Sequence, residues 1–139
     1  MTTKTIRLIA FIVLLVHGIG HFQGVVASLG VKINNSASSS SWILKGMKEQ
    51  AARTICFVLF LLTGLAGIIT ALGFFGVVFH GNHWETMALV TAFMSSVCLI
   101  LFWNCFAMFF NKIGAIAVNI LIYYSILFNQ QWPAALFEN

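Results

Sequence analysis

Two histidines stand four residues apart in the stretch LLVHGIGHFQG, close to the start of the chain. His17 and His21 fall inside a segment without charged residues that runs from Leu8 to Val31. Imidazoles at positions i and i+4 share one face of a helix, where they can bind a metal, form hydrogen bonds or carry a proton. Polar groups inside an apolar span are costly unless they find partners. The pair therefore predicts a binding site or hydrogen bonds between helices.

Polar residues of the other expected helices fall at nearly the same depth as the histidines. At about 1.5 Å per residue, His21 lies about 12 Å below the 31–53 connection, and Asn104 and Asn119 lie about 9 Å from the same side. Such groups should turn inward and meet one another, because hydrocarbon offers them no partners. The depths predict one interior polar layer formed by His17, His21, Thr63, Asn104, Asn119 and Tyr123.

Small residues support an inward orientation of the histidine face. Gly20 and Gly24 lie on the same face of the first helix, and a Gly-x-x-x-Gly spacing allows a neighbouring helix to approach closely. This face is therefore expected to meet the second and fourth spans in the interior of a bundle.

The polar layer has three interpretations. It can be a set of hydrogen bonds that fixes the packing, a pocket for a lipid-like or quinone-like head group, or a site for a metal or haem. No Asp or Glu occurs in any expected span, so a third strong metal ligand is missing. His17 and His21 share one face, so they cannot ligate one haem from opposite sides. The first two interpretations are favoured, and the sequence assigns no cofactor.

The stretch HGNHWE is the second place where metal ligands gather. His80, His83 and Glu85 could together hold a metal ion at the surface. The pattern is more typical of a solvated turn with Trp84 at the membrane interface, and we favour this second interpretation.

The three cysteines all lie in apolar runs. Cys56, Cys98 and Cys105 are therefore expected to be small buried apolar residues. The sequence contains no Cys-x-x-Cys motif, which argues against a thiol relay of the vitamin K reductase or disulfide-oxidase type.

Composition identifies the environment of the chain. Hydrophobic residues make up 60% of the sequence and charged residues 7%, whereas a soluble domain carries roughly 25% charged residues. This is too few charged side chains for a water-soluble surface. The protein is therefore predicted to be an integral membrane protein. The net charge of +4 comes from basic residues beside apolar runs, and there is no basic patch of the kind that binds nucleic acid.

The apolar runs predict an all-α fold, a four-helix transmembrane bundle in a single domain over residues 1–139. A membrane core about 30 Å thick requires roughly 20 apolar residues per helix. Between the first two spans, residues 42–53 mix apolar and basic side chains and predict a short helix in the membrane interface. The four runs that qualify as spans are Leu8–Leu29, Thr54–Phe79, Thr86–Phe110 and Ile113–Phe128.

Basic residues predict the orientation of the bundle. Lys4 and Arg7 lie on the side of the two termini. The opposite side holds Lys32, Lys45, Lys48, Arg53 and Lys112. Since loops rich in Lys and Arg stay in the cytoplasm, the 31–53 connection is expected to be cytoplasmic.

The motif His17-Gly18-Ile19-Gly20-His21 resembles the first-helix signature of small four-span bacterial membrane proteins of the DoxX-like kind. The resemblance extends to the layout of most of the chain, with a polar connection followed by three closely spaced spans. It implies a helical bundle in the bacterial cytoplasmic (inner) membrane and an association with quinone-linked redox complexes. The resemblance does not identify any catalytic residue in this sequence.

Two functional hypotheses follow. In the first, the polar layer binds a small lipophilic ligand, or the protein acts with a quinone-linked redox complex. In the second, the protein is a non-catalytic accessory subunit or oligomer whose partners are the lipid bilayer, other membrane subunits or further copies of itself. A transporter or channel is disfavoured, since the spans contain neither charge nor proline. Neither hypothesis assigns a catalytic residue, so enzymatic activity is left open.

Overall fold

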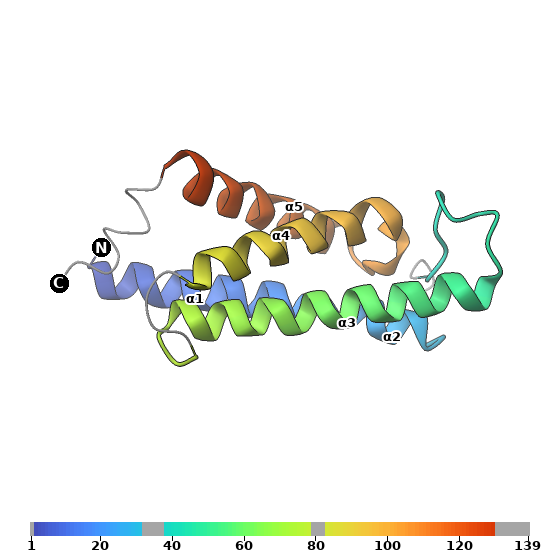
Figure 1. Ribbon diagram of the computed structural model, residues 1–139, viewed down its shortest axis with the longest axis horizontal. Helices are drawn as coiled ribbons and strands as arrows, with labels where there is room; N and C mark the ends of the chain where they lie inside the picture. Colours follow the sequence, from blue (N-terminus) through green and yellow to red (C-terminus); the bar gives the residue numbers. More distant parts are fainter. Residues whose placement is uncertain (1, 32–37, 79–82, 130–139) are drawn as a thin grey trace.

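The computed structural model describes residues 2–31, 38–78 and 83–129, and these residues form helices joined by turns (Figure 1). Four segments are long and apolar enough to span a membrane: Thr3–Ser28, Glu49–Phe74, His83–Leu101 and Phe109–Phe128. The predicted all-α fold is confirmed, and the protein is a multi-pass membrane protein. In chain order the elements are α1 (Thr3–Gly20), α2 (Phe22–Ser28), α3 (Glu49–Phe74), α4 (His83–Leu101), the 3-10 turn η1 (Trp103–Cys105), α5 (Phe109–Tyr123) and the π-helical η2 (Tyr124–Phe128).

Helix α3 is the centre of the bundle. It packs along α1 and α2 on one side and along α4 on the other. Helix α5 packs mainly on α4 and touches α1 at fewer points. Figure 1 shows α1 and α3 side by side over much of the length of α1, with α5 on the far side of α4 from α3. The α1–α5 contact is therefore looser than the contacts of α3 with α1 and α4 and the contact of α4 with α5.

Glycines set the tight crossing of α1 and α3. A Cβ atom on Gly18 would lie 2.8 Å from the carbonyl carbon of Gly67, and one on Gly67 would lie 2.6 Å from the Cα of Gly18. Gly24 accommodates the ring of Phe60, which a Cβ atom would approach to 2.2 Å. The prediction of a close approach is therefore correct for Gly24. It is wrong for Gly20, where a Cβ atom would meet no described atom within 4 Å.

The first span is interrupted at His21, the residue between α1 and α2. The His21 N–H donates to the Gly18 carbonyl at 3.2 Å, and the Gly24 N–H donates to the His21 carbonyl at 3.0 Å. Both bonds connect residues three apart, as in a 3-10 turn. This local tightening places the His21 side chain at the break between the two helices.

The predicted interfacial helix over 42–53 is wrong for its first half, because residues 42–48 are not helical and α3 begins at Glu49. The Trp42 indole donates to the Ile100 carbonyl at 2.7 Å, which ties this segment to the end of α4. The Ser41 hydroxyl accepts the Leu44 N–H at 3.2 Å in a local turn. These side-chain bonds replace the hydrogen bonds of a helix.

The predicted boundary between the third and fourth spans is also wrong. Helix α4 ends at Leu101 and α5 begins at Phe109, so the connection covers residues 102–108 instead of the predicted turn at 111–112. The connection has apolar residues like those of a span, because Phe102, Cys105 and Phe106 are buried inside the protein. A buried apolar loop and a spanning helix have the same composition, and the sequence alone did not separate them.

Candidate functional site

Both histidines lie inside the bundle. His17 is 8% exposed and His21 is 1% exposed. Their rings are perpendicular, with centroids 5.0 Å apart. The ring of His21 also contacts two aromatic rings from other parts of the fold, Phe60 of α3 at 5.8 Å and Phe106 of the 102–108 connection at 5.7 Å. The pair therefore lies where α1, α3 and the start of the last span converge.

One nitrogen of each imidazole lacks a hydrogen-bond partner. Within the described residues, Nε2 of His17 and Nδ1 of His21 are buried and make no hydrogen bond. A buried polar atom without a partner costs free energy, and nearly all such atoms in folded proteins are satisfied. Two orphaned nitrogens four residues apart are therefore a candidate contact for a ligand rather than a feature of packing.

A cavity of about 350 Å³ adjoins the histidines between α1 and α5. Its polar lining consists of His17, His21, Gln23 and Asn111, and its walls include Val13, Val16, Phe106, Phe110, Ala115 and Val118. Gly20 and Gly114 also line it, and a Cβ atom at either would meet no described atom within 4 Å. This volume is in the range of small-molecule sites, which combine apolar walls with a few placed polar groups.

A larger apolar cavity continues along the same two helices. It has a volume of about 510 Å³ and shares Val13 and Val118 with the histidine cavity. Its lining includes Phe74, Trp84 and Ile122, which belong to a buried apolar cluster at the end of the bundle where α1 begins. Together the two cavities form a groove along α1 and α5, polar near the histidines and apolar beyond them.

Gln23 and Asn111 close the polar end of this groove. The Gln23 Oε1 accepts a hydrogen bond from Asn111 Nδ2 at 3.0 Å and another from the Ala107 N–H at 3.3 Å. These bonds attach the start of α5 to α2. Neither residue was among the predicted site residues. Gln23 lies in the same uncharged segment as the histidines and could have been found by the same criterion, whereas Asn111 was assigned to a turn.

The other members of the predicted polar layer are distributed over separate contacts. Thr63 donates to the Leu59 carbonyl at 2.7 Å and lies 3.5 Å from the sulfur of Cys98, between α3 and α4. Asn119 donates to Ser95 at 3.0 Å and to Ser96 at 3.2 Å, between α4 and α5. Neither side chain forms a hydrogen bond with a histidine. The residues predicted to form one layer lie at similar depths but face different neighbouring helices, because their helices are rotated differently about their axes.

Two predicted members do not join the histidines. Asn104 lies in η1 and is exposed, because α4 ends before it. Tyr123 is half-buried and lines a separate groove of about 400 Å³ with Asn119, Trp42 and Trp103. The prediction of Asn104 as an interior residue is therefore wrong, and its physical cause is the early end of α4.

The structure does not support a metal site at the predicted surface residues His80, His83 and Glu85. His80 lies outside the described residues. His83 is exposed at the start of α4, and Glu85, two residues further on, is half-buried. In the part of the chain that the structure describes, no three His, Cys, Asp or Glu side chains gather as metal ligands.

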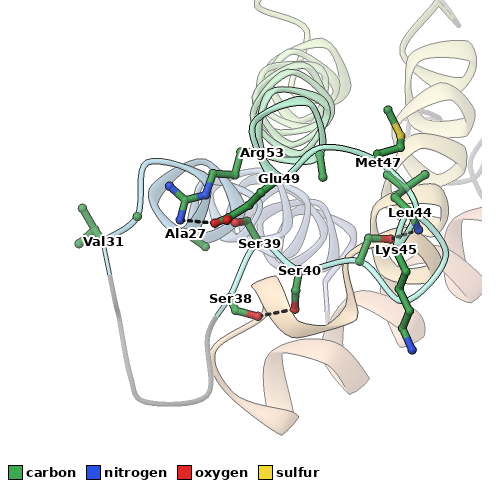
Figure 2. Close-up of a pocket in the computed structure, with 13 residues that line it drawn as sticks. Ala27, Val31, Ser38, Ser39, Ser40, Leu44, Lys45, Met47, Glu49 and Arg53 are labelled. Atoms are coloured by element: carbon green, nitrogen blue, oxygen red, sulfur yellow. Dashed lines mark hydrogen bonds and ion pairs between the residues drawn. The ribbon is translucent and has the colours of Figure 1, made fainter.

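A polar cavity of about 400 Å³ lies at the opposite end of the bundle from the start of α1, and Figure 2 shows the residues that surround it. Arg53 and Glu49 form an ion pair at 2.9 Å on its α3 side, and the hydroxyls of Ser38 and Ser40 lie 2.7 Å apart on its other side. None of the lining residues has a polar side-chain atom that is both buried and without a hydrogen-bond partner, unlike His17 and His21.

Comparison of the chain with family models, curated proteins and solved structures gives no match. The resemblance to DoxX-like proteins therefore stays a prediction.

Proposed function

We propose that the protein binds a lipophilic molecule with a polar head group, with the head at His17 and His21 and the apolar part along α1 and α5. The observation that carries this proposal is the pair of buried imidazole nitrogens without partners beside a cavity. The adjoining apolar cavity supports a ligand with a tail, since a compact polar solute would leave that surface uncovered.

A quinone fits these groups better than a charged lipid head. A neutral imidazole has one N–H donor and one acceptor nitrogen, which matches the carbonyl oxygens of a quinone and the hydroxyls of its reduced form. The lining residues of the histidine cavity include no Lys, Arg, Asp or Glu to neutralise a phosphate or an ammonium group. Phe106 and Phe110 provide flat apolar surfaces for a ring.

We further propose a bacterial cytoplasmic membrane as the location, with the 31–53 connection in the cytoplasm. Among the described residues, Lys45, Lys48, Arg53 and Lys112 gather at this end of the bundle, whereas Lys4 and Arg7 lie at the other. A reporter fused after Asn139 tests the orientation, and it should be active on the periplasmic side. Cytoplasmic activity of an intact fusion would reverse the orientation.

Thermal unfolding in mild detergent tests ligand binding. Decyl-ubiquinone, a short-chain quinone, should raise the melting temperature of the wild-type protein, because a ligand at a hundredfold excess over its Kd contributes about 2.7 kcal/mol. Gly114→Leu should fill the cavity and remove this response. Ala117→Leu is the matched control, because Ala117 is exposed on the same helix and does not line the groove.

The outcomes separate the two functional hypotheses. A response in the wild type and Ala117→Leu that is lost in Gly114→Leu supports a site in the groove. An equal response in all three proteins would place quinone binding elsewhere. If decyl-ubiquinone and an extract of membrane lipids leave all three proteins unchanged, the accessory-subunit hypothesis is favoured instead.

A further inference from the structure

Cys56 and Cys105 meet in the interior although they are 49 positions apart in the chain. Cys56 belongs to α3, and Cys105 ends η1. Both are fully buried thiols, and their Sγ atoms lie 3.2 Å apart. A disulfide bond is about 2.05 Å long, so the two sulfur atoms need to approach by only about 1 Å to form one. The fold therefore creates a dithiol that the spacing of the cysteines did not suggest.

The contacts around the two sulfur atoms are weak. Cys56 Sγ lies 3.7 Å from the Gly24 carbonyl oxygen, and Cys105 Sγ lies 3.3 Å from the Ser38 carbonyl oxygen. Cys98 belongs to the same buried cluster but contacts Thr63 instead. The two thiols are thus held against each other without a strong competing partner, and Cys98 provides a natural comparison.

Aromatic side chains connect this thiol pair with the histidine cavity. Phe106 directly follows Cys105, and Phe60 lies one helical turn after Cys56. The rings of Phe60 and Phe106 have centroids 5.5 Å apart, and both contact the ring of His21. Phe106 also lines the cavity. The dithiol and the proposed quinone site therefore share one buried cluster.

We propose that Cys56 and Cys105 are a redox-active dithiol that is oxidised to a disulfide by a quinone bound in the histidine cavity. Both S–H bonds break and one S–S bond forms, which releases two electrons and two protons. These convert the two carbonyl groups of the quinone into the two hydroxyl groups of a hydroquinone. His17 and His21 are the lining side chains that can accept and donate these protons. The choice of oxidant rests on the proposed function.

The experiment follows both products with the purified full-length protein. The protein is reduced, freed of reductant and mixed with decyl-ubiquinone without oxygen. The ring of decyl-ubiquinone is fully substituted, so thiols have no open position to which they can add. Mass spectrometry after alkylation should find peptides joined through Cys56 and Cys105, and absorbance should show one quinone consumed per disulfide. Thermal unfolding of the same samples records binding separately.

Variants assign the reaction to this pair and this cavity. Cys56→Ser and Cys105→Ser should each abolish quinone consumption, whereas Cys98→Ala should retain it. Gly114→Leu leaves all three thiols in place and should slow quinone-dependent oxidation at least tenfold. Diamide, a small thiol oxidant, should still form the same disulfide in Gly114→Leu, which shows that the variant is folded and its thiol pair intact.

Three results would overturn the proposal, and only the third is also a failure of the proposed function. If decyl-ubiquinone stabilises the protein and Cys56 and Cys105 stay reduced, the site binds quinone and the dithiol is structural. If diamide links Cys56 or Cys105 to Cys98 in place of linking them to each other, the pair itself is wrong. If diamide forms the expected disulfide and decyl-ubiquinone neither binds nor reacts, the quinone site fails and quinone is excluded as the oxidant.

Discussion

The two sides of α3 use polar residues differently. Toward α4, the hydroxyls of Thr70 and Thr91 form a hydrogen bond of 3.0 Å, and each hydroxyl also lies 2.8 Å from a carbonyl oxygen of its own helix. Toward α1 and α5, the two histidines leave nitrogen atoms without partners beside a cavity. Both regions place polar groups at membrane depth. Of these two regions, only the second leaves buried side-chain atoms without hydrogen-bond partners, which makes it the candidate site.

The same contrast appears in the packing of small residues. Gly18 and Gly67 bring the backbones of α1 and α3 into contact, whereas Gly20 and Gly114 face open space between α1 and α5. Glycine thus permits close packing in one region and leaves room for a ligand in the other. Substitution of individual glycines by alanine separates these two roles.

The largest effect is expected at the tight crossing. Gly67→Ala places a Cβ atom 2.6 Å from the Gly18 Cα, which is backbone and cannot move aside cheaply. We expect the free energy of unfolding to fall by about 1–3 kcal/mol, in line with other overpacked sites. Thermal unfolding in detergent measures this. Gly20→Ala is the control and should be neutral or more stable by up to about 1 kcal/mol, since alanine favours helix over glycine.

A melting temperature of Gly67→Ala equal to that of the wild type would show that α1 and α3 do not cross at these glycines. A large loss in Gly20→Ala would show instead that the α1–α5 side is packed, and it would remove the cavity from the proposed site.

An effect of similar size is expected at the hydrogen bonds of Gln23, at the polar end of the groove. Gln23→Leu removes the acceptor of two hydrogen bonds, from Asn111 and from Ala107. At about 0.5–1.5 kcal/mol for each bond, the loss in stability should be about 1–3 kcal/mol. Denaturation of Gln23→Leu, Asn111→Ala and the double variant checks this. Additive losses would mean that the two side chains do not interact.

A smaller effect is expected between α3 and α4. Thr91→Val removes the hydrogen bond to Thr70 and keeps the shape of the side chain. Hydrogen bonds between membrane helices average about 0.6 kcal/mol, with a maximum of about 1.7 kcal/mol, so the coupling of Thr70 and Thr91 should fall in this range. A double-mutant cycle with Thr70→Val measures it. A coupling free energy of zero would show that the hydroxyls of Thr70 and Thr91 do not form a hydrogen bond.

The sequence predicted the membrane fold because length and hydrophobicity alone determine which segments span a bilayer. It misplaced the third span because Phe102, Cys105 and Phe106 are apolar and yet form a buried connection. It also grouped His21, Thr63 and Asn119 by depth. Depth fixes height along the bundle but not rotation about each helix, so residues at one level face different neighbours.

Contacts between residues far apart in the chain could not be predicted from the sequence for the same reason. Nothing in the spacing of Cys56 and Cys105 indicates that they meet, since their contact depends on where η1 folds back over α3. The hydrogen bond between Gln23 and Asn111 requires α5 to begin at Phe109, whereas the predicted fourth span began only at Ile113. The histidine pair was found because its two members lie on one face of one helix.

The smallest effect on stability is expected at His21, and it carries the most information about function. His21→Leu would destabilise the protein if His21 held Asn104 or Asn119, as an interior polar layer requires. In the structure Nδ1 of His21 has no partner among the described residues, and Asn119 bonds to serines of α4. Replacement by a similar-sized apolar side chain should therefore change the stability of the ligand-free protein by less than about 0.5 kcal/mol, or raise it.

The same variant should lose most of the stabilisation by decyl-ubiquinone, because it removes one of the two imidazoles that we propose bind the head of the ligand. Thermal unfolding with and without quinone measures both quantities in one series, with Thr91→Val as a variant whose quinone response should match that of the wild type. A loss of more than about 1.5 kcal/mol in ligand-free His21→Leu would mean that this imidazole has a structural partner. His21 would then belong with Thr70 and Thr91 as a packing residue, and the distinction between the two sides of α3 would no longer hold.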